Sequence, residues 1–365
     1  MTAMLAARAH AGADALALEK IPVPEPGPGD VLVRVASAGL APSLMKLLAR
    51  GSFRYLPSTP GHEIAGTVAA VGPDADASLV GKRVRVHPGL SCRDCVYCRT
   101  DREQMCASAA MLGSGAHGTG PMPLYERYHD GGLAEFVRAP AWLVDVLPDR
   151  VGFDVAAKVQ DFGNALRAVR TADLPPGGTL VVTAATGTMG TATVKLAPHL
   201  GASRLILVGR SAERLAAVAA ISPLPARTVA LDDLGADWET SGGLTRRLLD
   251  LAPGGADAVV DYLPHGAGTG QATAALATGA TLVAMGGNRS PFPHTARDLQ
   301  HHCWRVAGTR GCTRADTAAV LDLLGSGALT ADELITHRFP LADVDAALTA
   351  LTDRTEPIWM AVVHP

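Results

Sequence analysis

The sequence contains no apolar run that approaches the roughly 20 residues a helix needs to cross a bilayer. Charge of neither sign is in excess. The formal net charge of −3 gives no electrostatic reason to bind nucleic acid or an anionic membrane. Residues 1–5 carry no charged side chain and are followed by His10 and Asp14, so they make a poor signal peptide. We therefore expect a soluble cytoplasmic protein, with no membrane and no nucleic acid among its partners.

Charged residues are scarce at 18%, whereas hydrophobic residues make up 48% of the chain. This composition supplies enough apolar side chains for sizeable cores and argues against disorder. With 365 residues, the chain is expected to form about two domains.

Cysteine is also scarce, yet four of the six cysteines are clustered with the spacing C-x2-C-x2-C-x7-C, namely Cys92, Cys95, Cys98 and Cys106. Such CxxC spacing brings four thiolates to one tetrahedral Zn²⁺. The surrounding lobe, residues 89–107, is too small to bury a core, so metal coordination would supply its folding energy. Disulfides are the weaker alternative in an intracellular chain. Cys303 and Cys312 lie far from the lobe and are expected to be small buried hydrophobes.

The pattern of predicted secondary structure differs between the two halves of the chain. The first half has short strands at 31–35, 63–72 and 83–86, separated by Gly and Pro, and is interpreted as all-β. From about residue 178, strands at 179–184, 205–208, 228–231, 258–261 and 281–285 alternate with helical segments such as 192–197. Such alternation predicts βαβ units and a parallel sheet. A helix over 315–324 and a strand over 358–363 close the chain, and this tail is able to return to the first domain. Residues 107–130, which include Tyr125 and Tyr128, are able either to cover a cleft between the domains or to form an oligomer contact.

A glycine-rich turn follows the strand 179–184 and opens a helix: Ala185, Thr186, Gly187, Thr188, Met189, Gly190. It matches G-x-G-x-x-G with Ala in the first position. Gly187 lets the backbone approach a pyrophosphate, and Gly190 lets helix and strand pack closely. The helix N-terminus then favours the phosphate charge. This context predicts a dinucleotide site.

The end of the next strand distinguishes the two nicotinamide cofactors. An NAD site carries Asp or Glu there, whereas this strand ends in Gly209, Arg210 and Ser211. Gly209 leaves room, the Arg210 guanidinium suits a phosphate, and Ser211 adds a hydroxyl. We expect NADP(H). The alternative is that Arg210 is a solvated residue at the start of a helix.

These features together resemble the medium-chain dehydrogenase/reductase superfamily, which includes zinc alcohol dehydrogenases and quinone oxidoreductases. The resemblance is carried by Gly61–Val68 (GHEIAGTV), the cysteine lobe, Gly131–Phe136 (GGLAEF), the nucleotide loop and Arg314–Asp316. It implies an α/β protein with a GroES-like β-rich catalytic domain over 1–151 and 312–365. A Rossmann domain, a doubly wound parallel sheet, would occupy 152–311. Members of the superfamily are usually homodimers or tetramers, so a homo-oligomer is expected.

The resemblance also locates the ligands of a second, catalytic zinc, and here this chain departs from the pattern. The Cys of the family's A-G-x-C-G-[ST]-D segment is replaced by Ala41, and Gln160 stands at the third ligand position. A one-residue shift in alignment offers Asp161 instead. Only His62 is kept with certainty. Because a catalytic zinc needs three protein ligands, we expect it to be absent.

The remaining site residues are expectations from the same resemblance. Ser43 stands where zinc alcohol dehydrogenases keep the proton-relay hydroxyl, and Lys46 where the relay ends. His62 and Asp161 are candidate proton donors, and Glu63 is expected to orient the loop around His62. Surface exposure for Lys46 and simple packing for His62 and for Tyr55 are the alternatives. The Rossmann positions expected to approach the nicotinamide are Gly286, Gly287, Gly308 and Thr309.

We therefore expect an NADPH-dependent reductase that has one structural zinc and acts on a small molecule with an activated C=C or C=N bond. Enones, enoyl thioesters and iminium ions need no Lewis acid to accept a hydride. One alternative is a zinc-dependent alcohol dehydrogenase with His62 and Asp161 as unusual ligands. Another is an inactive scaffold or sensor that binds NADPH without turnover.

Overall fold

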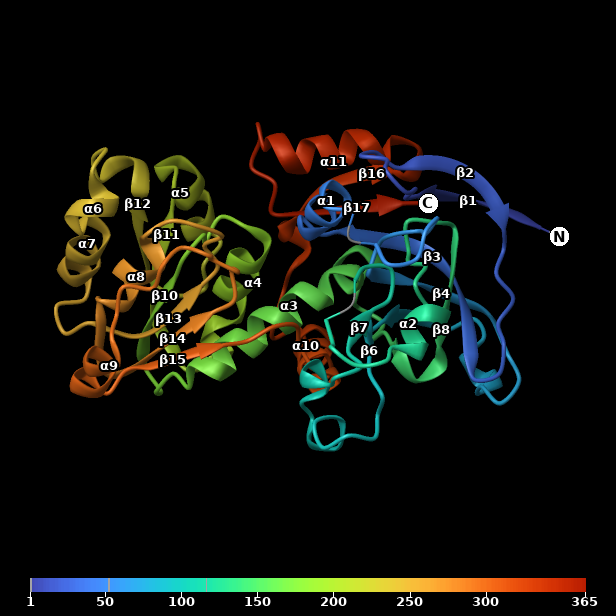
Figure 1. Cartoon of the computed structure of the whole chain (residues 1–365), viewed down its shortest axis with the longest axis horizontal. Helices are drawn as coiled ribbons and strands as arrows, with labels where there is room; N and C mark the ends of the chain where they lie inside the picture. Colours follow the sequence, from blue (N-terminus) through green and yellow to red (C-terminus); the bar gives the residue numbers. More distant parts are fainter. Residues whose placement is uncertain (1, 52, 116) are drawn as a thin grey trace. The chain divides into compact units, whose positions relative to one another are not determined.

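The apolar runs of residues 178–285 form parallel strands of a six-stranded sheet in the computed structural model (Figure 1). Its strands are β10 (Gly178–Val182), β11 (Ala202–Gly209), β12 (Ala226–Ala230), β13 (Ala256–Asp261), β14 (Leu276–Ala284) and β15 (Arg305–Gly308). They lie in the order β12-β11-β10-β13-β14-β15, and every neighbouring pair is parallel. The order reverses between β10 and β13, and open α/β sheets bind their ligands at such a reversal.

Helices connect these strands and lie around the sheet in Figure 1. They are α4 (Thr188–Leu196), α5 (Ala212–Ala220), α6 (Trp238–Ser241), α7 (Gly243–Leu251), α8 (Gly268–Thr273) and α9 (Ala296–His302). Strand β10 is buried along its whole length. This explains why it appears in the sequence as a continuous apolar run instead of an alternating one.

The structure describes residues 2–51, 53–115 and 117–365, and the chain forms two units. The first is Met1–Gln160 with Thr313–Pro365, and the second, which contains the parallel sheet, is Asp161–Cys312. Helix α3 (Phe153–Ala172) carries the chain from the first unit into the second. The domain boundaries at 151/152 and 311/312 stay predictions.

Antiparallel pairing dominates the first unit. Its strands are β1 (Ala3–Arg8), β2 (Ala17–Pro22), β3 (Asp30–Leu40), β4 (Glu63–Val71), β5 (Arg83–Val86), β6 (Gly89–Leu90), β7 (Ala110–Met111), β8 (Phe136–Pro140), β9 (Val144–Val146), β16 (Ile335–Pro340) and β17 (Met360–His364). Seven of them form one sheet, in which β3 lies between β4 and β17 and also pairs with β8. The C-terminal strand thus completes the sheet that the N-terminal strands begin.

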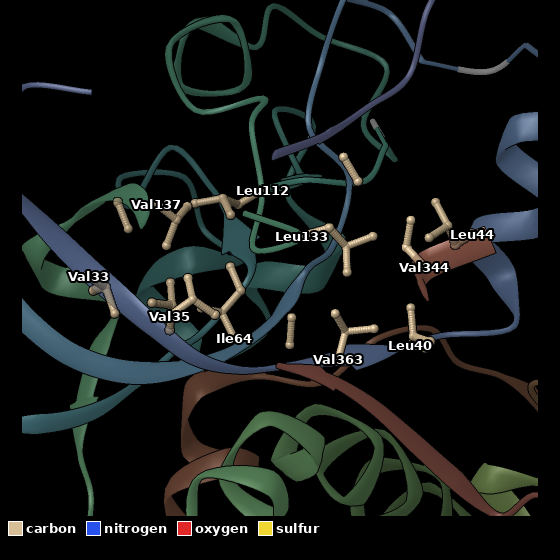
Figure 2. Close-up of a cluster of buried hydrophobic side chains, with 14 of the residues drawn as sticks. Val33, Val35, Leu40, Leu44, Ile64, Leu112, Leu133, Val137, Val344 and Val363 are labelled. Carbon is tan, nitrogen blue, oxygen red and sulfur yellow. The ribbon is translucent and has the colours of Figure 1, made fainter. Parts of the chain in front are cut away.

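Buried aliphatic side chains fill the core of the first unit (Figure 2). Val33 and Leu40 of β3, Ile64 of β4, and Val363 of β17 are at most 1% exposed. Leu133 joins them from the loop before β8. Residues from distant parts of the sequence therefore hold the segment that carries His62.

Two helices, α1 (Ser43–Ala49) and α2 (Pro123–Arg127), and the start of α3 correct the expectation of an all-β first half. The tail contains the expected helix as α10 (Arg314–Ser326) and a further one, α11 (Val344–Asp353). The expected helix over 315–324 is two residues longer at its end and one at its start. The Thr313 hydroxyl and Asp316 form a reciprocal capping box, and Gly327 ends the helix at a φ of 78°.

The aromatic residues of 107–130 pack inside the first unit. Tyr125 and Tyr128 are buried, and their hydroxyls donate to the Ser114 carbonyl at 2.9 Å and to the Asp30 carboxylate at 2.5 Å. Tyr55 stacks edge-on against Tyr125 at 5.5 Å between ring centroids. These side chains therefore act in packing.

The expectation for Cys303 was wrong, whereas Cys312 is buried as expected. Cys303 follows the last residue of α9 in the left-handed region, at a φ of 55°, and it is exposed because the helix ends there. Within the ranges that the structure describes, we find no helix that is both long and apolar enough to span a membrane.

Candidate functional site

The four clustered cysteines of the first unit converge. All four Sγ atoms lie within 4.8 Å of one another. The Sγ of Cys98 is 3.8 Å from that of Cys92 and 3.6 Å from that of Cys95. Four sulfurs held 2.3 Å from a tetrahedral zinc would be about 3.8 Å apart. All are free thiols, so the donor set and its spacing fit a structural zinc.

The protonation of these thiols also suits a cation. Backbone N–H groups of Asp94 and Cys95 lower the pKa of Cys92 to about 6. Burial raises the pKa of Cys98 to about 12, because it removes water from the charged thiolate, and hydrogen bonds with Cys95 and Cys106 act in the same direction. A bound Zn²⁺ would offset this by stabilising every coordinated thiolate.

Few apolar side chains of the cysteine lobe are buried, Leu90 among them. Its short 3-10 turns, Cys98–Thr100 and Glu103–Met105, contain no buried residue, and Val96 is 62% exposed. A Glu103 carboxylate oxygen accepts the backbone N–H of Arg314, at the first turn of α10, at 2.6 Å, and the Arg93 guanidinium lies over the Trp142 ring at 5.0 Å. A metal bound by the four thiolates would therefore add to the order of this lobe.

Four glycines from three segments meet immediately before His62. The N–H of Gly61 donates to the Gly113 carbonyl and the N–H of Gly132 to the Gly61 carbonyl, both at 2.8 Å. A Cβ on Gly131 would lie 2.7 Å from the Cα of Gly113 and would overlap the Gly61 carbonyl oxygen. Only glycine permits this close crossing, which fixes the backbone leading into His62.

Arg8 of β1 braces the same approach. Its guanidinium donates to the Thr59 hydroxyl at 2.9 Å, the Asp130 carboxylate at 2.8 Å and the Pro57 carbonyl at 2.7 Å. Asp130 also accepts the backbone N–H of Thr59. No local sequence pattern predicts these contacts of Arg8, because its partners are distant from it along the chain.

A buried ion pair lies directly behind His62. The Lys158 ammonium of α3 is 2.5 Å from one oxygen of Glu63, and neither side chain is exposed. The other oxygen of Glu63 lies 3.8 Å from Nε2 of His62. The ammonium also donates to the Leu40 carbonyl at 3.5 Å. Glu63 therefore lies between His62 and a lysine that was not among the predicted site residues. The one sequence pattern that could have indicated Lys158 is a charged residue among the apolar residues Val155, Ala156, Ala157 and Val159.

The residues at the expected catalytic-zinc positions do not fit that metal. Ala41 is buried and offers a methyl group, and Gln160 is buried and offers an amide. Among residues 2–51, 53–115 and 117–365, three or more His, Cys, Asp or Glu side chains come close enough to share a metal ion only in the cysteine cluster. That cluster does not include His62.

The other sequence-derived candidates divide between the two units. Ser43 and Lys46 are both exposed on α1, three residues apart and thus on one face of the helix. His62 is buried at the start of β4. Asp161 is buried on α3 and belongs to the second unit, so its role beside His62 stays a prediction.

In the second unit the glycine-rich turn connects β10 to α4, at the reversal of strand order. Gly187 is the N-cap residue of α4, and a Cβ there would meet only the Ala184 carbonyl oxygen, at 3.4 Å. A Cβ on Gly190 would come 2.5 Å from the Cα of Ala185. Helix and strand therefore pack as closely as a dinucleotide fold requires, and the turn fits a pyrophosphate.

The strand-end residues of the second unit lie where the sequence placed them. Gly209 ends β11, Arg210 follows and is exposed, and the Ser211 hydroxyl caps α5 by accepting the N–H of Arg214. Gly286 and Gly287 follow β14, Gly308 is the last residue of β15, and Thr309 follows it. The carboxyl ends of β10, β11, β14 and β15 thus all carry candidate cofactor-binding residues.

Comparison with known proteins agrees with this architecture. The family described as "Alcohol dehydrogenase GroES-like domain" matches residues 27–149, and "Zinc-binding dehydrogenase" matches residues 188–326. The chain is 25% identical to L-galactonate-5-dehydrogenase of Escherichia coli (strain K12) over 86% of its length and 85% of that protein's. It is 28% identical to sorbitol dehydrogenase of Bacillus subtilis (strain 168) over 63% of its length and 67% of that protein's. A thermostable alcohol dehydrogenase from Pyrobaculum aerophilum superposes with a TM-score of 0.82 at 26% identity, with both chains covered completely. The two-unit fold, the paired family matches and these relatives establish that the chain belongs to the medium-chain dehydrogenase/reductase superfamily, whose members are oxidoreductases.

Proposed function

We propose that this protein is an NADPH-dependent reductase of a small molecule with an activated C=C or C=N bond, and that its active site works without a catalytic zinc. The observation that carries the proposal is the chemistry at the positions where the resemblance expects the other two zinc ligands: a methyl group at Ala41 and an amide at Gln160, while Glu63 is paired with Lys158. A methyl group and an amide are not ligands that a catalytic zinc takes, so substrates that accept hydride without one are favoured. The structural zinc is assigned to Cys92, Cys95, Cys98 and Cys106.

NADPH, when bound, supplies the hydride. Addition of a hydride to the C=C bond of an enone or enoyl thioester leaves an electron pair that must take up a proton, whereas an iminium ion becomes a neutral amine without one. His62 is the proposed donor, oriented through Glu63. Ser43 and Lys46 are exposed and would return a proton from solvent. Asp161 is a second candidate donor.

The relatives favour a second candidate function. L-galactonate-5-dehydrogenase and sorbitol dehydrogenase are named for substrates that carry hydroxyl groups. On this alternative the protein oxidises an alcohol or polyol, and a zinc bound by His62 and Asp161 is required.

Zinc analysis of the purified protein and of His62→Ala separates the two functions. We expect about one zinc per chain in both proteins, bound by the cysteine lobe, and NADPH-dependent turnover of an enone, enoyl thioester or iminium ion. Two zincs, falling to one in His62→Ala, would contradict the proposal and support the alcohol dehydrogenase. Tight NADPH binding without turnover of any acceptor would instead indicate a scaffold or sensor.

Replacing Arg210 tests the cofactor. In Arg210→Ala we expect the KM for NADPH to rise about 10- to 100-fold, because a charge-assisted hydrogen bond to the ribose phosphate is lost. The kcat with either cofactor and the KM for NADH should change little. Arg214→Ala, four residues later and on α5, is the matched control. An equal effect of Arg210→Ala on both cofactors would exclude phosphate recognition by this residue.

A further inference from the structure

A lysine ammonium contacts two of the three segments in which the family resemblance expects catalytic-zinc ligands, and it lies on the helix that forms the third. Lys158 is hydrogen-bonded to the Leu40 carbonyl, one residue before Ala41, and to Glu63, one residue after His62. Along α3 it precedes Gln160 by two residues. A single cation therefore contacts the immediate neighbours of two former ligand positions and sits on the helix that bears the third.

The chain makes room for this pair at a cost. A Cβ on Gly39 would overlap a carboxylate oxygen of Glu63 and lie 2.9 Å from Cδ of Lys158. Complete burial removes both charges from water, and a buried ion pair seldom recovers that desolvation by its own attraction. Stability alone does not account for a lysine here, since an apolar residue would pack among Val155, Ala157 and Val159 without it.

The arrangement of charge resembles that of a metal site. One oxygen of Glu63 faces Nε2 of His62 and the other holds the ammonium, so imidazole, carboxylate and cation are neighbours. We propose that the Lys158 ammonium is the resident cation of this site: it takes the place of the catalytic zinc and excludes a divalent metal. This inference rests on the proposed function and specifies why His62 would exchange a proton instead of binding a metal.

The exclusion is tested by restoring the lost ligands with and without the lysine. Ala41→Cys with Gln160→Glu recreates the ligand types, and a second protein adds Lys158→Met. Zinc per chain is counted in one sample of each protein that has been saturated with zinc. A second sample, with zinc in the cysteine lobe only, is titrated with Co²⁺. We expect one zinc in the first protein and two in the second. Co²⁺ should bind the second at least about 10- to 100-fold more tightly, the usual effect of a residue adjacent to metal ligands.

A second metal in the protein that keeps Lys158, with equal affinity for Co²⁺, would overturn the inference, and so would one metal in both proteins. Neither result would affect the proposed function, which depends on one zinc in the natural sequence. Because Lys158→Met leaves Glu63 buried without its partner, the series is repeated with Glu63→Gln added, which removes both charges and should restore the melting temperature. If metal uptake fails there as well, misfolding is excluded as the cause and the inference is wrong.

Discussion

Removing zinc from the cysteine lobe should lower the melting temperature of the protein by roughly 8–16 °C. Zinc present at about 1,000 times its Kd stabilises the folded state by about 4 kcal/mol, and each kcal/mol shifts the melting point by about 2–4 °C in a unit of this size. Cys98→Ser should have the same effect, since Cys98 contacts both Cys92 and Cys95. The lobe buries few apolar side chains that could replace the metal.

The measurement is a thermal melt with and without a chelator, accompanied by limited proteolysis. Cleavage should become rapid between residues 91 and 109 once zinc is lost. Cys303→Ser is the control, because Cys303 is also exposed but lies outside the lobe. It should retain one zinc and melt normally. A chelated protein that melts unchanged and resists cleavage would show that the lobe is held without metal.

Gly131→Ala should destabilise the first unit by about 3 kcal/mol, at the upper end of the cost of adding a methyl group where there is no room. The added methyl would overlap the Gly61 carbonyl and lie within 2.7 Å of the Gly113 Cα, and backbone atoms yield less readily than side chains. The segment that must move leads directly into His62. We therefore expect a fall in kcat together with a melting temperature lower by roughly 6–12 °C.

Gly152→Ala provides the matched control for this change. No atom lies within 4 Å of a Cβ at Gly152, and its φ needs no glycine. Its stability should stay within about 0.5 kcal/mol of the natural protein. Equal behaviour of the two variants would show that the crossing at Gly61 relaxes easily, and would remove its claim to fix His62.

Short-range patterns were the predictable part of this molecule. The cysteine cluster was foreseen because the thiols that converge are close in sequence, and the strands of the second unit because buried parallel strands are continuous apolar runs. The helix α1 was missed because Gly and Pro dominate its surroundings. Its Ser43 is the first helical residue after Pro42, a start without a side-chain cap.

Contacts between residues far apart in the sequence could not be predicted from it. Lys158 and Glu63 are separated by 95 residues, and nothing near either one indicates the partner. A lysine is ordinarily a surface residue, so its burial depends wholly on tertiary structure. The same holds for Arg8, whose partners at Thr59 and Asp130 lie on other segments. The Ala at position 41, where the resemblance expects a Cys, could be recognised in the sequence, whereas the buried Lys158–Glu63 pair could not.

The position of β17 has a consequence for how the protein is made. In the first unit β17 lies inside the sheet, between β16 and β3, yet it is formed by residues 360–364. The second unit is continuous in sequence and ends at Cys312. On a ribosome that adds about 5–20 residues per second, it has several seconds to fold before β17 is synthesised. During that time residues 38–40 of β3 lack their β17 partner and are available to a neighbouring nascent chain. We therefore expect the yield of folded protein to depend on the protection of these residues during translation, by a chaperone or by rapid release.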